Sequence, residues 1–246
     1  MRIATWNLER PSGRRLSRGE RISKVMESVA ADIWVLTETV ENVRPHGMTQ
    51  GFWSATPERI GHSTERWVAI WTRYTDVVQL DVSDPIRSAA VRVRRNGRRD
   101  LVIFGTVLPW IGSAWQGISA KEGAAFQAAV ETQAADWCRF ARLKDADLVV
   151  AGDLNQDFND RHYYGSKRNR HILSAALDRA GLRVASGYPH DPVRAHAPSR
   201  ASIDHICVPE TGSHWKRTSP LSWPQTPAPD PSLSDHFGLA LDVDDH

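Results

Sequence analysis

The sequence of 246 residues predicts one α/β (α+β) domain, residues 1–246, built as a four-layer sandwich of two packed mixed β-sheets flanked by helices. Three observations predict this class. Strand-like and helix-like runs interleave along the chain, hairpin signals occur among them, and no internal repeat or linker-like change in composition divides the sequence. A hydrophobic content of 41% is sufficient for a large core.

The first half of the chain supplies most of the expected strands. Apolar residues from Ile22 to Val29 have helical spacing, which predicts a helix over residues 20–30. Residues 41–64 contain several Gly and Pro and are expected to be irregular. Strands are expected over residues 2–7, 32–38, 67–71, 77–82, 89–95 and 100–107, with a hairpin turn at Asn96-Gly97 between the last two.

The second half contains two expected helices. The first covers residues 119–143, because Ser119 and Glu122 form a capping-box pattern at its start. The second covers residues 171–180 and ends at Gly181. Strands are expected over residues 147–151, 203–208 and 237–243, with a basic loop at 161–170 and a Pro-rich segment at 218–233.

Composition gives weaker indications. The net charge is +2, and 26 of the 31 basic residues are Arg, which suits phosphate contacts but also follows from a genome rich in G and C. Cys138 and Cys207 form no CxxC pair, so we expect two buried thiols and neither a zinc site nor a disulfide framework. No leader or run of transmembrane length is visible, so we expect a cytoplasmic monomer without a membrane anchor.

Five short polar motifs lie at or near the ends of predicted strands. They are Trp6-Asn7-Leu8-Glu9, Thr37-Glu38, Gly152-Asp153-Leu154-Asn155, Ile203-Asp204-His205 and Ser234-Asp235-His236. Each motif by itself has an ordinary explanation, such as an Asx turn or a solvated strand end. Carboxylates, amides and histidines gathered on strand ends are typical of a metal-assisted hydrolytic site, and the ordered set is more specific than any member.

The residue types in these motifs indicate roles. Asp153 and Asn155 follow a buried strand, and a carboxylate with an amide suits orienting a water and holding a phosphoryl oxygen. Glu38 is well placed as an oxygen ligand for Mg²⁺ or Mn²⁺. Asp204 lies in an apolar strand and needs a partner, for which the imidazole of His236 is one candidate.

The other motif residues leave alternatives open. Asn7 could hold the Glu38 carboxylate or a phosphate oxygen. Glu9 shares a face with Asn7 if the strand continues, and could ligate a second ion or face water. Asp235 could bind metal or fix the tautomer of the neighbouring histidine.

Together these motifs, which span the chain from Trp6 to Asp242, resemble those of the endonuclease/exonuclease/phosphatase superfamily, the fold of deoxyribonuclease I and exonuclease III. Thr37 stands where the family has Gln. The resemblance implies in-line attack of water on a phosphoester with Mg²⁺ as cofactor, or Mn²⁺ in its place. It implies Glu38 as main metal ligand with Asn7 in support and Glu9 and Asp235 as further ligands, and Asp153, Asn155, Asp204 and His236 as catalytic residues.

In that resemblance, Asp153 positions or deprotonates the water, Asn155 holds the phosphate, and Asp204 orients His236. One departure stands out. The family usually has a His or Tyr at the end of the strand before the long helix, and residues 104–110 contain neither. Candidate substitutes are His62, His162, Tyr163 and Lys167.

Substrate preference depends on loops. Of the Arg-rich stretches 10–21, 92–99 and 161–170, the third follows the Gly-Asp-x-Asn motif, so we expect Tyr163, Lys167 and Arg168 to contact substrate and Trp110 to stack on it. No amphipathic anchor favours a lipid. We expect a nuclease acting on DNA or RNA; the alternatives are a hydrolase of a small or lipid-like phosphate, or a binding protein that has lost turnover.

Overall fold

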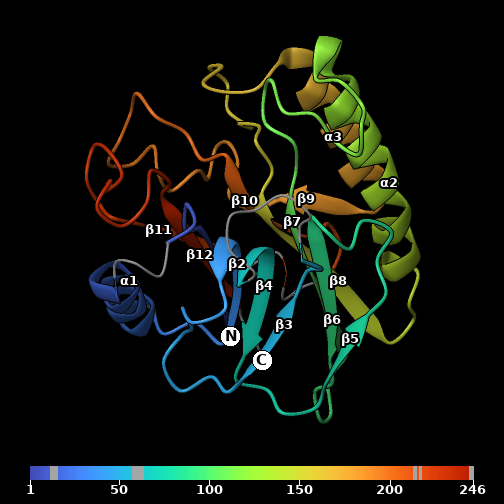
Figure 1. The fold of residues 1–246 in the computed structure, drawn as a ribbon. Coiled ribbons are helices and arrows are strands. Elements are labelled where there is room, and N and C mark those ends of the chain that lie inside the picture. Colours follow the sequence, from blue (N-terminus) through green and yellow to red (C-terminus); the bar gives the residue numbers. More distant parts are fainter. Residues whose placement is uncertain (12–15, 57–63, 213–214, 216–217, 244–246) are drawn as a thin grey trace.

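The computed structural model describes residues 1–11, 16–56, 64–212, 215 and 218–243. Two six-stranded mixed sheets pack against each other, and helices cover their outer faces (Figure 1). The strand orders are β11-β12-β1-β2-β4-β3 and β5-β6-β7-β8-β10-β9. Within each sheet one pair is parallel, β1 with β2 and β7 with β8. The predicted four-layer α/β sandwich is therefore confirmed.

The bounds of the elements follow from the backbone pairing. The first sheet contains β1 (Arg2–Asn7), β2 (Ile33–Val40), β3 (Gln50–Trp53), β4 (Glu65–Thr72), β11 (Thr218–Trp223) and β12 (Gly238–Val243). The second contains β5 (Val77–Leu80), β6 (Ser88–Val93), β7 (Asp100–Val107), β8 (Ala146–Asp153), β9 (Leu182–Val184) and β10 (Asp204–Pro209). The helices are α1 (Leu16–Val29), α2 (Ala124–Ala141) and α3 (Lys167–Arg179), with a 3-10 turn η1 (Lys121–Gly123) before α2.

Three apolar layers hold the sandwich together. Aliphatic side chains from both sheets, such as Val35 and Ile103, fill the space between the sheets. Helix α1 packs Ile22 and Met26 on the outer face of the first sheet. Helices α2 and α3 cover the second sheet, where Trp137 meets Phe104 edge to face. Most strands therefore bury at least one face, which stabilises the fold by removing apolar surface from water.

The helix boundaries differ from those expected. Gly123 and Glu122 have left-handed φ values of 76° and 56°, so the expected capping box at Ser119 does not form and α2 begins at Ala124. The hydroxyl of Ser119 instead accepts the backbone N–H of Lys121. Helix α3 begins earlier than expected, because the side chain of Ser166 caps it by accepting the N–H of Asn169.

Three strands lie in segments where none was expected. β3 lies in the segment expected to be irregular, β11 in the Pro-rich segment, and β9 follows the second helix. All three occupy the edges of their sheets. Edge strands are short and tolerate Pro, as at Pro220, so their sequences carry a weak pattern. The hairpin at Asn96-Gly97 is confirmed by the antiparallel pairing of β6 with β7.

Several strand ends meet at one end of the sandwich. The carboxyl ends of β1, β2, β7 and β8 lie there together with the amino ends of β10 and β12. No described helix is long and apolar enough to cross a membrane. Both cysteines are free thiols, Cys207 buried and Cys138 half-buried.

Candidate active site

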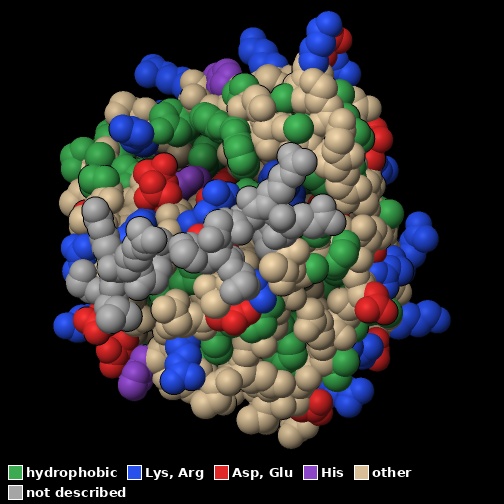
Figure 2. Space-filling model, in the orientation of Figure 1, with side chains coloured by type: hydrophobic (Ala, Val, Ile, Leu, Met, Phe, Trp, Pro, Cys, Tyr) green, Lys and Arg blue, Asp and Glu red, His purple; other side chains and the backbone are tan. Residues whose placement is uncertain are grey.

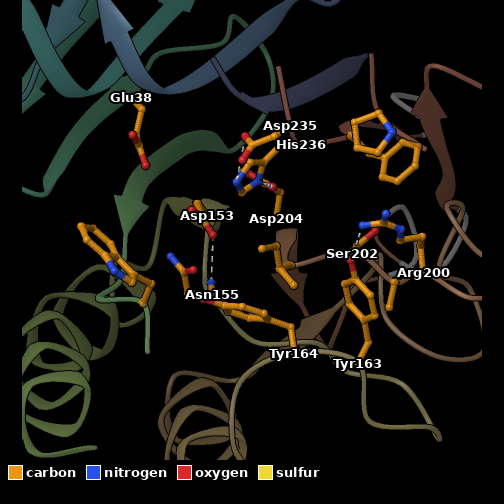
Figure 3. A pocket seen from close by; sticks show the side chains of 15 residues that line it. Glu38, Asp153, Asn155, Tyr163, Tyr164, Arg200, Ser202, Asp204, Asp235 and His236 are labelled. Carbon is orange, nitrogen blue, oxygen red and sulfur yellow. Dashed lines mark hydrogen bonds and ion pairs between the residues drawn. The ribbon is translucent and has the colours of Figure 1, made fainter. Parts of the chain in front are cut away.

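A cavity of about 400 Å³ opens at these strand ends (Figure 3). Its lining combines acidic, aromatic and small polar side chains from both sheets and the loops beyond them. The lining residues are Glu38, Trp110, Asp153, Asn155, Tyr163, Tyr164, Arg200, Ala201, Ser202, Ile203, Asp204, Pro229, Asp235, His236 and Phe237. Four of the five predicted motifs therefore contribute a side chain to the cavity.

The strand register brings two of these carboxylates together. Asp153 ends β8 and lies directly opposite Asp204, which begins β10. Gly152 makes the preceding turn of the backbone possible, since its φ is 138° and a Cβ atom there would lie 2.0 Å from the carbonyl oxygen of Thr106. Glycine at this position is thus required for Asp153 to reach the cavity.

Asp204 and His236 form a short ion pair. The Nδ1 atom of His236 lies 2.6 Å from Oδ2 of Asp204. Burial by itself lowers the pKa of His236; the carboxylate of Asp204 outweighs that effect, aided by Asp153 and Asp235, and raises the pKa to about 10. The imidazole is therefore a cation at neutral pH, and its Nε2 is free of the Asp204 contact.

Asp153 is the second group in the cavity whose pKa is shifted. Burial raises the pKa of Asp153 to about 7, and the negative charge of Asp204 adds to the increase while His236 opposes it. Its Oδ1 accepts the backbone N–H of Asn155 at 3.0 Å, which is the expected Asx turn. A carboxylate whose pKa lies near neutrality is suited to accept a proton.

Asn7 links the two sheets at this site. Its Nδ2 donates to Glu38 Oε1 at 3.3 Å and to Asp153 Oδ2 at 3.1 Å, while its Oδ1 accepts the N–H of Glu9. Of the two roles considered for Asn7, this geometry favours holding the Glu38 carboxylate. Within the first sheet, the hydroxyl of Ser234 donates to the carbonyl oxygen of Asn7 at 2.6 Å and holds the segment before β12 against the end of β1.

Strained backbone accompanies the site. Non-glycine residues with left-handed φ include Glu9 (50°), Arg10 (44°), Glu38 (44°) and Asn155 (50°). Each such conformation costs about 1–3 kcal/mol and persists where the surroundings enforce it, as functional sites do. For Glu38, the enforcing contacts include its carbonyl oxygen, which accepts the N–H of Arg10 at 2.7 Å.

The donor set fits a divalent cation. Carboxylate oxygens of Asp153 and Asp204 lie within 4.8 Å of each other, whereas the neighbouring imidazole of His236 is protonated and offers no lone pair to a metal. Oδ1 of Asp204 is buried and has no hydrogen-bond partner among the described residues. Glu38 adds a further carboxylate at the cavity and forms an ion pair with Arg10, whose Nη2 lies 3.2 Å from Oε2 of Glu38. Carboxylate oxygens are the ligands that Mg²⁺ and Mn²⁺ prefer.

Four predicted site residues do not line the cavity: Asn7, described above, and Glu9, Lys167 and Arg168. Glu9 is half-exposed and pairs with Arg18 at 2.9 Å, so it does not face the other carboxylates. Lys167 and Arg168 are exposed in the first turn of α3, where Arg168 donates to the side-chain oxygen of Gln127. Asp235 does line the cavity, with its Oδ1 3.8 Å from Nε2 of His236.

A cation–π stack lies at the strand end where the family has a His or Tyr. Arg87 lies across from the end of β7, its carbonyl oxygen accepting the N–H of Val107. Its guanidinium lies 4.4 Å from the ring centre of Trp67 and 5.5 Å from that of Trp110. Arg10 lies over Trp67 at 4.5 Å. Trp110 therefore belongs partly to this stack and partly, 40% exposed, to the cavity wall.

Some of the residues proposed to replace that His or Tyr line the cavity and others do not. Tyr163 lines the cavity, as does its neighbour Tyr164, whose phenol has its pKa raised by burial and by the charge of Asp153. His162 lies 3.5 Å from the buried carboxylate of Asp157 and does not line the cavity. His62 lies outside the described residues.

Sequence reasoning missed part of the cavity wall. Arg200, Ser202 and Phe237 line it but belong to no expected substrate-contacting segment. Arg200 and Ser202 precede β10 by a few residues, and Phe237 directly follows the Ser-Asp-His motif. Proximity to a motif was thus the available signal, whereas richness in arginine pointed to other segments.

Arginines of the second arginine-rich stretch form ion pairs. Residues 92–99 form the hairpin at the opposite end of β6 and β7 from the cavity, where Arg92 and Arg99 pair with Asp145 and Asp147. On the face seen in Figure 2, Lys and Arg side chains are spread around the outline with acidic side chains between them. The second stretch is therefore a solvated, ion-paired surface.

Comparison with solved structures identifies the fold. The endonuclease domain of TRAS1, a telomere-specific non-LTR retrotransposon, matches with a TM-score of 0.65 and 16% identity over 98% of this chain and 97% of that one. The 3'-5' exonuclease NExo from Neisseria meningitidis matches with a TM-score of 0.64 and 21% identity over 99% and 100% of the two chains. TDP2 from C. elegans matches with a TM-score of 0.65 and 16% identity over 98% and 74%.

An endonuclease/exonuclease/phosphatase protein from Beutenbergia cavernae has the same fold, with a TM-score of 0.62 and 19% identity over 99% of this chain and 71% of that one. No protein-family model and no curated protein sequence matches the chain. The chain therefore has the fold of the endonuclease/exonuclease/phosphatase superfamily, which confirms the resemblance drawn from its motifs.

Proposed function

We propose that this protein is a metal-dependent phosphodiester hydrolase that acts on nucleic acid. The observation that carries the proposal is that one cavity holds a carboxylate and an imidazole whose pKa values are both perturbed. Asp153 is a buried carboxylate with a pKa of about 7, and His236 is an imidazole with a pKa of about 10. A carboxylate with a pKa near neutrality and an imidazole that is still protonated at neutral pH are suited to act as base and acid at one reacting centre.

In the proposed reaction, Asp153 positions the attacking water and accepts its proton as the water oxygen bonds to phosphorus. His236 faces the phosphate with Nε2–H, neutralises the developing negative charge, and gives a proton to the leaving oxygen as the P–O bond breaks. Asp204 keeps the imidazole protonated and oriented through its 2.6 Å contact. Asn155 completes the wall beside Asp153, with one amide N–H donated to the carbonyl oxygen of Leu108.

Glu38 is the proposed principal ligand for Mg²⁺ or Mn²⁺, with Asn7 fixing its carboxylate and Asp235 as a further ligand. A divalent cation bound there would supply charge neutralisation for the phosphoryl oxygens. The carboxylates of the cavity would repel a phosphate in the absence of such a cation, which supports the metal requirement. The solved structures of similar fold include an endonuclease domain and an exonuclease, which supports a nucleic-acid substrate.

The test is hydrolysis of bis(p-nitrophenyl) phosphate, plasmid DNA, single-stranded DNA and RNA with Mg²⁺, Mn²⁺ or EDTA. We expect EDTA to abolish cleavage and Asp153→Asn and His236→Gln each to lower kcat by about 10²- to 10⁴-fold. Asp178→Asn and His171→Gln are matched controls, because both residues are exposed on α3 away from this cavity. Turnover unaffected by Asp153→Asn and His236→Gln, or by EDTA, would overturn the proposal.

A further inference from the structure

Arg200 is a cavity-lining cation without an acidic partner. Its Nη1 donates to the hydroxyl oxygen of Tyr163 at 2.9 Å, and no described carboxylate lies within ion-pair distance of it. Three arginines in or near the other motif loops are neutralised, since Arg10 pairs with Glu38, Arg18 with Glu9 and Arg170 with Asp157. A guanidinium that bonds a neutral oxygen keeps its full charge and several donors for an anionic ligand.

The segment that carries Arg200 is held by a buried carboxylate. Asp191 accepts the hydroxyl of Ser202 at 2.8 Å and the backbone N–H of Ser202 at 2.9 Å. It also accepts Nδ2 of Asn159 at 2.8 Å, which joins this segment to the loop after β8. Asp191 is 6% exposed, so these bonds are shielded from water and fix the backbone two residues from Arg200.

The segment that carries Tyr163 is held in the same manner. The carboxylate of Asp157 is fully buried and accepts the backbone N–H groups of Tyr163 at 2.9 Å and Tyr164 at 2.8 Å. Arg170 donates to both oxygens of Asp157 at 3.0 Å. Two buried carboxylates therefore preorganise the two loops whose side chains meet at the Arg200–Tyr163 hydrogen bond.

Arg200 is also separated from the principal metal ligand. Figure 3 shows Glu38 and Arg200 at opposite sides of the cavity, with Asp153, Asp204 and His236 between them. The lining thus has acidic groups at one side and, at the other, a guanidinium beside the ring of Tyr163, which is 38% exposed. A ligand that spans this cavity would contact the carboxylates at one side and the guanidinium of Arg200 at the other, with Asp153 and His236 between them.

We propose that Arg200, oriented by Tyr163, binds the phosphate adjacent to the scissile one in a polynucleotide strand. This inference rests on the proposed function, because the scissile phosphate is taken to lie at Asp153 and His236. A backbone phosphate presents oxygens that a guanidinium binds through charge-assisted hydrogen bonds. A substrate with a single phosphate cannot make this contact, so Arg200 selects polynucleotides over small phosphoesters.

The test measures binding separately from turnover. Binding of a short fluorescent single-stranded DNA is followed by anisotropy with Mg²⁺ in an Asp153→Asn background, so that the strand is bound without being cut. We expect Arg200→Gln to weaken binding about tenfold, the loss expected for one hydrogen bond to a charged group. The slope of log affinity against log salt should fall by about 0.7, the contribution of one phosphate contact in a single strand.

Arg179→Gln is the matched control, because Arg179 is exposed in the last turn of α3 and does not line the cavity. It should change neither quantity. Tyr163→Phe keeps the ring and removes the hydroxyl, so it should weaken binding in the same direction by less. Equal melting temperatures of the Arg200→Gln and parent proteins exclude a folding defect, and the Tyr163→Phe result carries the test if they differ.

A parallel arm uses bis(p-nitrophenyl) phosphate, which has one phosphate, with Arg200→Gln in the otherwise unchanged protein. Its kcat/KM on this small diester should fall by much less than the DNA affinity falls. Arg200→Gln that binds DNA like Arg179→Gln, or that lowers kcat/KM on the small diester as much as it lowers DNA affinity, would overturn the inference. Absence of turnover on every substrate, with DNA binding still lost in Arg200→Gln, would refute the proposed function and leave the phosphate contact standing.

Discussion

Nδ1 of His236 lies 2.6 Å from Oδ2 of Asp204, and this contact joins the two sheets of the sandwich. Asp204 begins β10 in the second sheet, whereas His236 lies two residues before β12 in the first. Asp153 lies opposite Asp204 on β8, so both members of the proposed acid–base pair depend on one carboxylate. The charge state of the site is consequently controlled by how the sheets pack.

Replacing Asp204 with Asn should remove the charge that keeps His236 protonated. Because the carboxylate of Asp204 raises the pKa of His236 to about 10, the variant should have a lower imidazole pKa. We expect kcat to fall by about 10²- to 10⁴-fold and the alkaline limb of the pH–rate profile to move toward neutrality. NMR titration of His236 checks the pKa directly; an unchanged imidazole pKa would contradict the assigned role.

Replacing Asp153 with Asn should stabilise the metal-free protein as pH rises. The folded-state pKa of about 7 lies above the value of 3.8 for an exposed carboxyl, so the folded protein holds this proton more tightly than the unfolded chain. Raising the pH from about 4 to about 7 therefore removes stability from the parent but not from the variant.

Between these two pH values, the unfolding free energy of the variant minus that of the parent should increase by on the order of 2–4 kcal/mol. Denaturant unfolding in EDTA at several pH values measures it, and hydrogen bonds altered at every pH cancel from the comparison. Asp178→Asn, on the exposed face of α3, should give a flat difference. A flat difference for Asp153→Asn as well would show that folding does not raise the pKa of this carboxyl group.

Addition of Mg²⁺ or Mn²⁺ should raise the melting temperature of the parent protein and not that of Glu38→Gln. A ligand that binds the folded state alone stabilises it by about 2.7 kcal/mol at a hundred times its Kd. Glu9→Gln is the informative comparison, since Glu9 pairs with Arg18 outside the cavity and should leave the metal response intact. Loss of the response in Glu9→Gln would make Glu9 a ligand after all.

The cation–π stack predicts an energetic coupling between Arg87 and Trp67. Their guanidinium and ring lie 4.4 Å apart, and Arg87 is 8% exposed, so the interaction is largely desolvated. Burial lowers the pKa of Arg87, because the guanidinium has lost hydration that its neighbours replace only in part. A double-mutant cycle with Arg87→Met and Trp67→Leu should give a coupling of about 1–2 kcal/mol in unfolding free energy. Strictly additive effects would show that the contact contributes nothing.

The position of the candidate site could be predicted from sequence because its residues follow buried strands. A run such as Leu148–Ala151 is apolar whatever surrounds it, and the polar residues after it must lie at a strand end. Ends of neighbouring strands in one sheet meet, which is why Asp153 and Asp204 converge as expected. The edge strands β3, β9 and β11 escaped prediction because their pairing on one side alone leaves a weak hydrophobic pattern.

Residues whose role depends on loop direction could not be placed in advance. Glu9 has a left-handed φ of 50°, which breaks the alternation that would have put it beside Asn7. Arg168 became part of α3 because Ser166 caps that helix, and its side chain then faced α2 rather than the cavity. Local charge density in the sequence therefore pointed to an arginine that does not line the cavity.

By itself, the sequence determined the layers of the fold and the ordered carboxylates, amides and histidine, since hydrophobic periodicity and strand-end motifs are local properties. The tertiary structure decided which charges meet. Packing of the two sheets set the 2.6 Å contact of His236 with Asp204, and the buried carboxylates of Asp157 and Asp191 directed Tyr163 and Arg200 into the cavity. His236 and Asp204 lie 32 residues apart and on different sheets, so no short stretch of sequence encodes both partners, and the loops beside them follow hydrogen bonds to acids that are buried only in the folded chain.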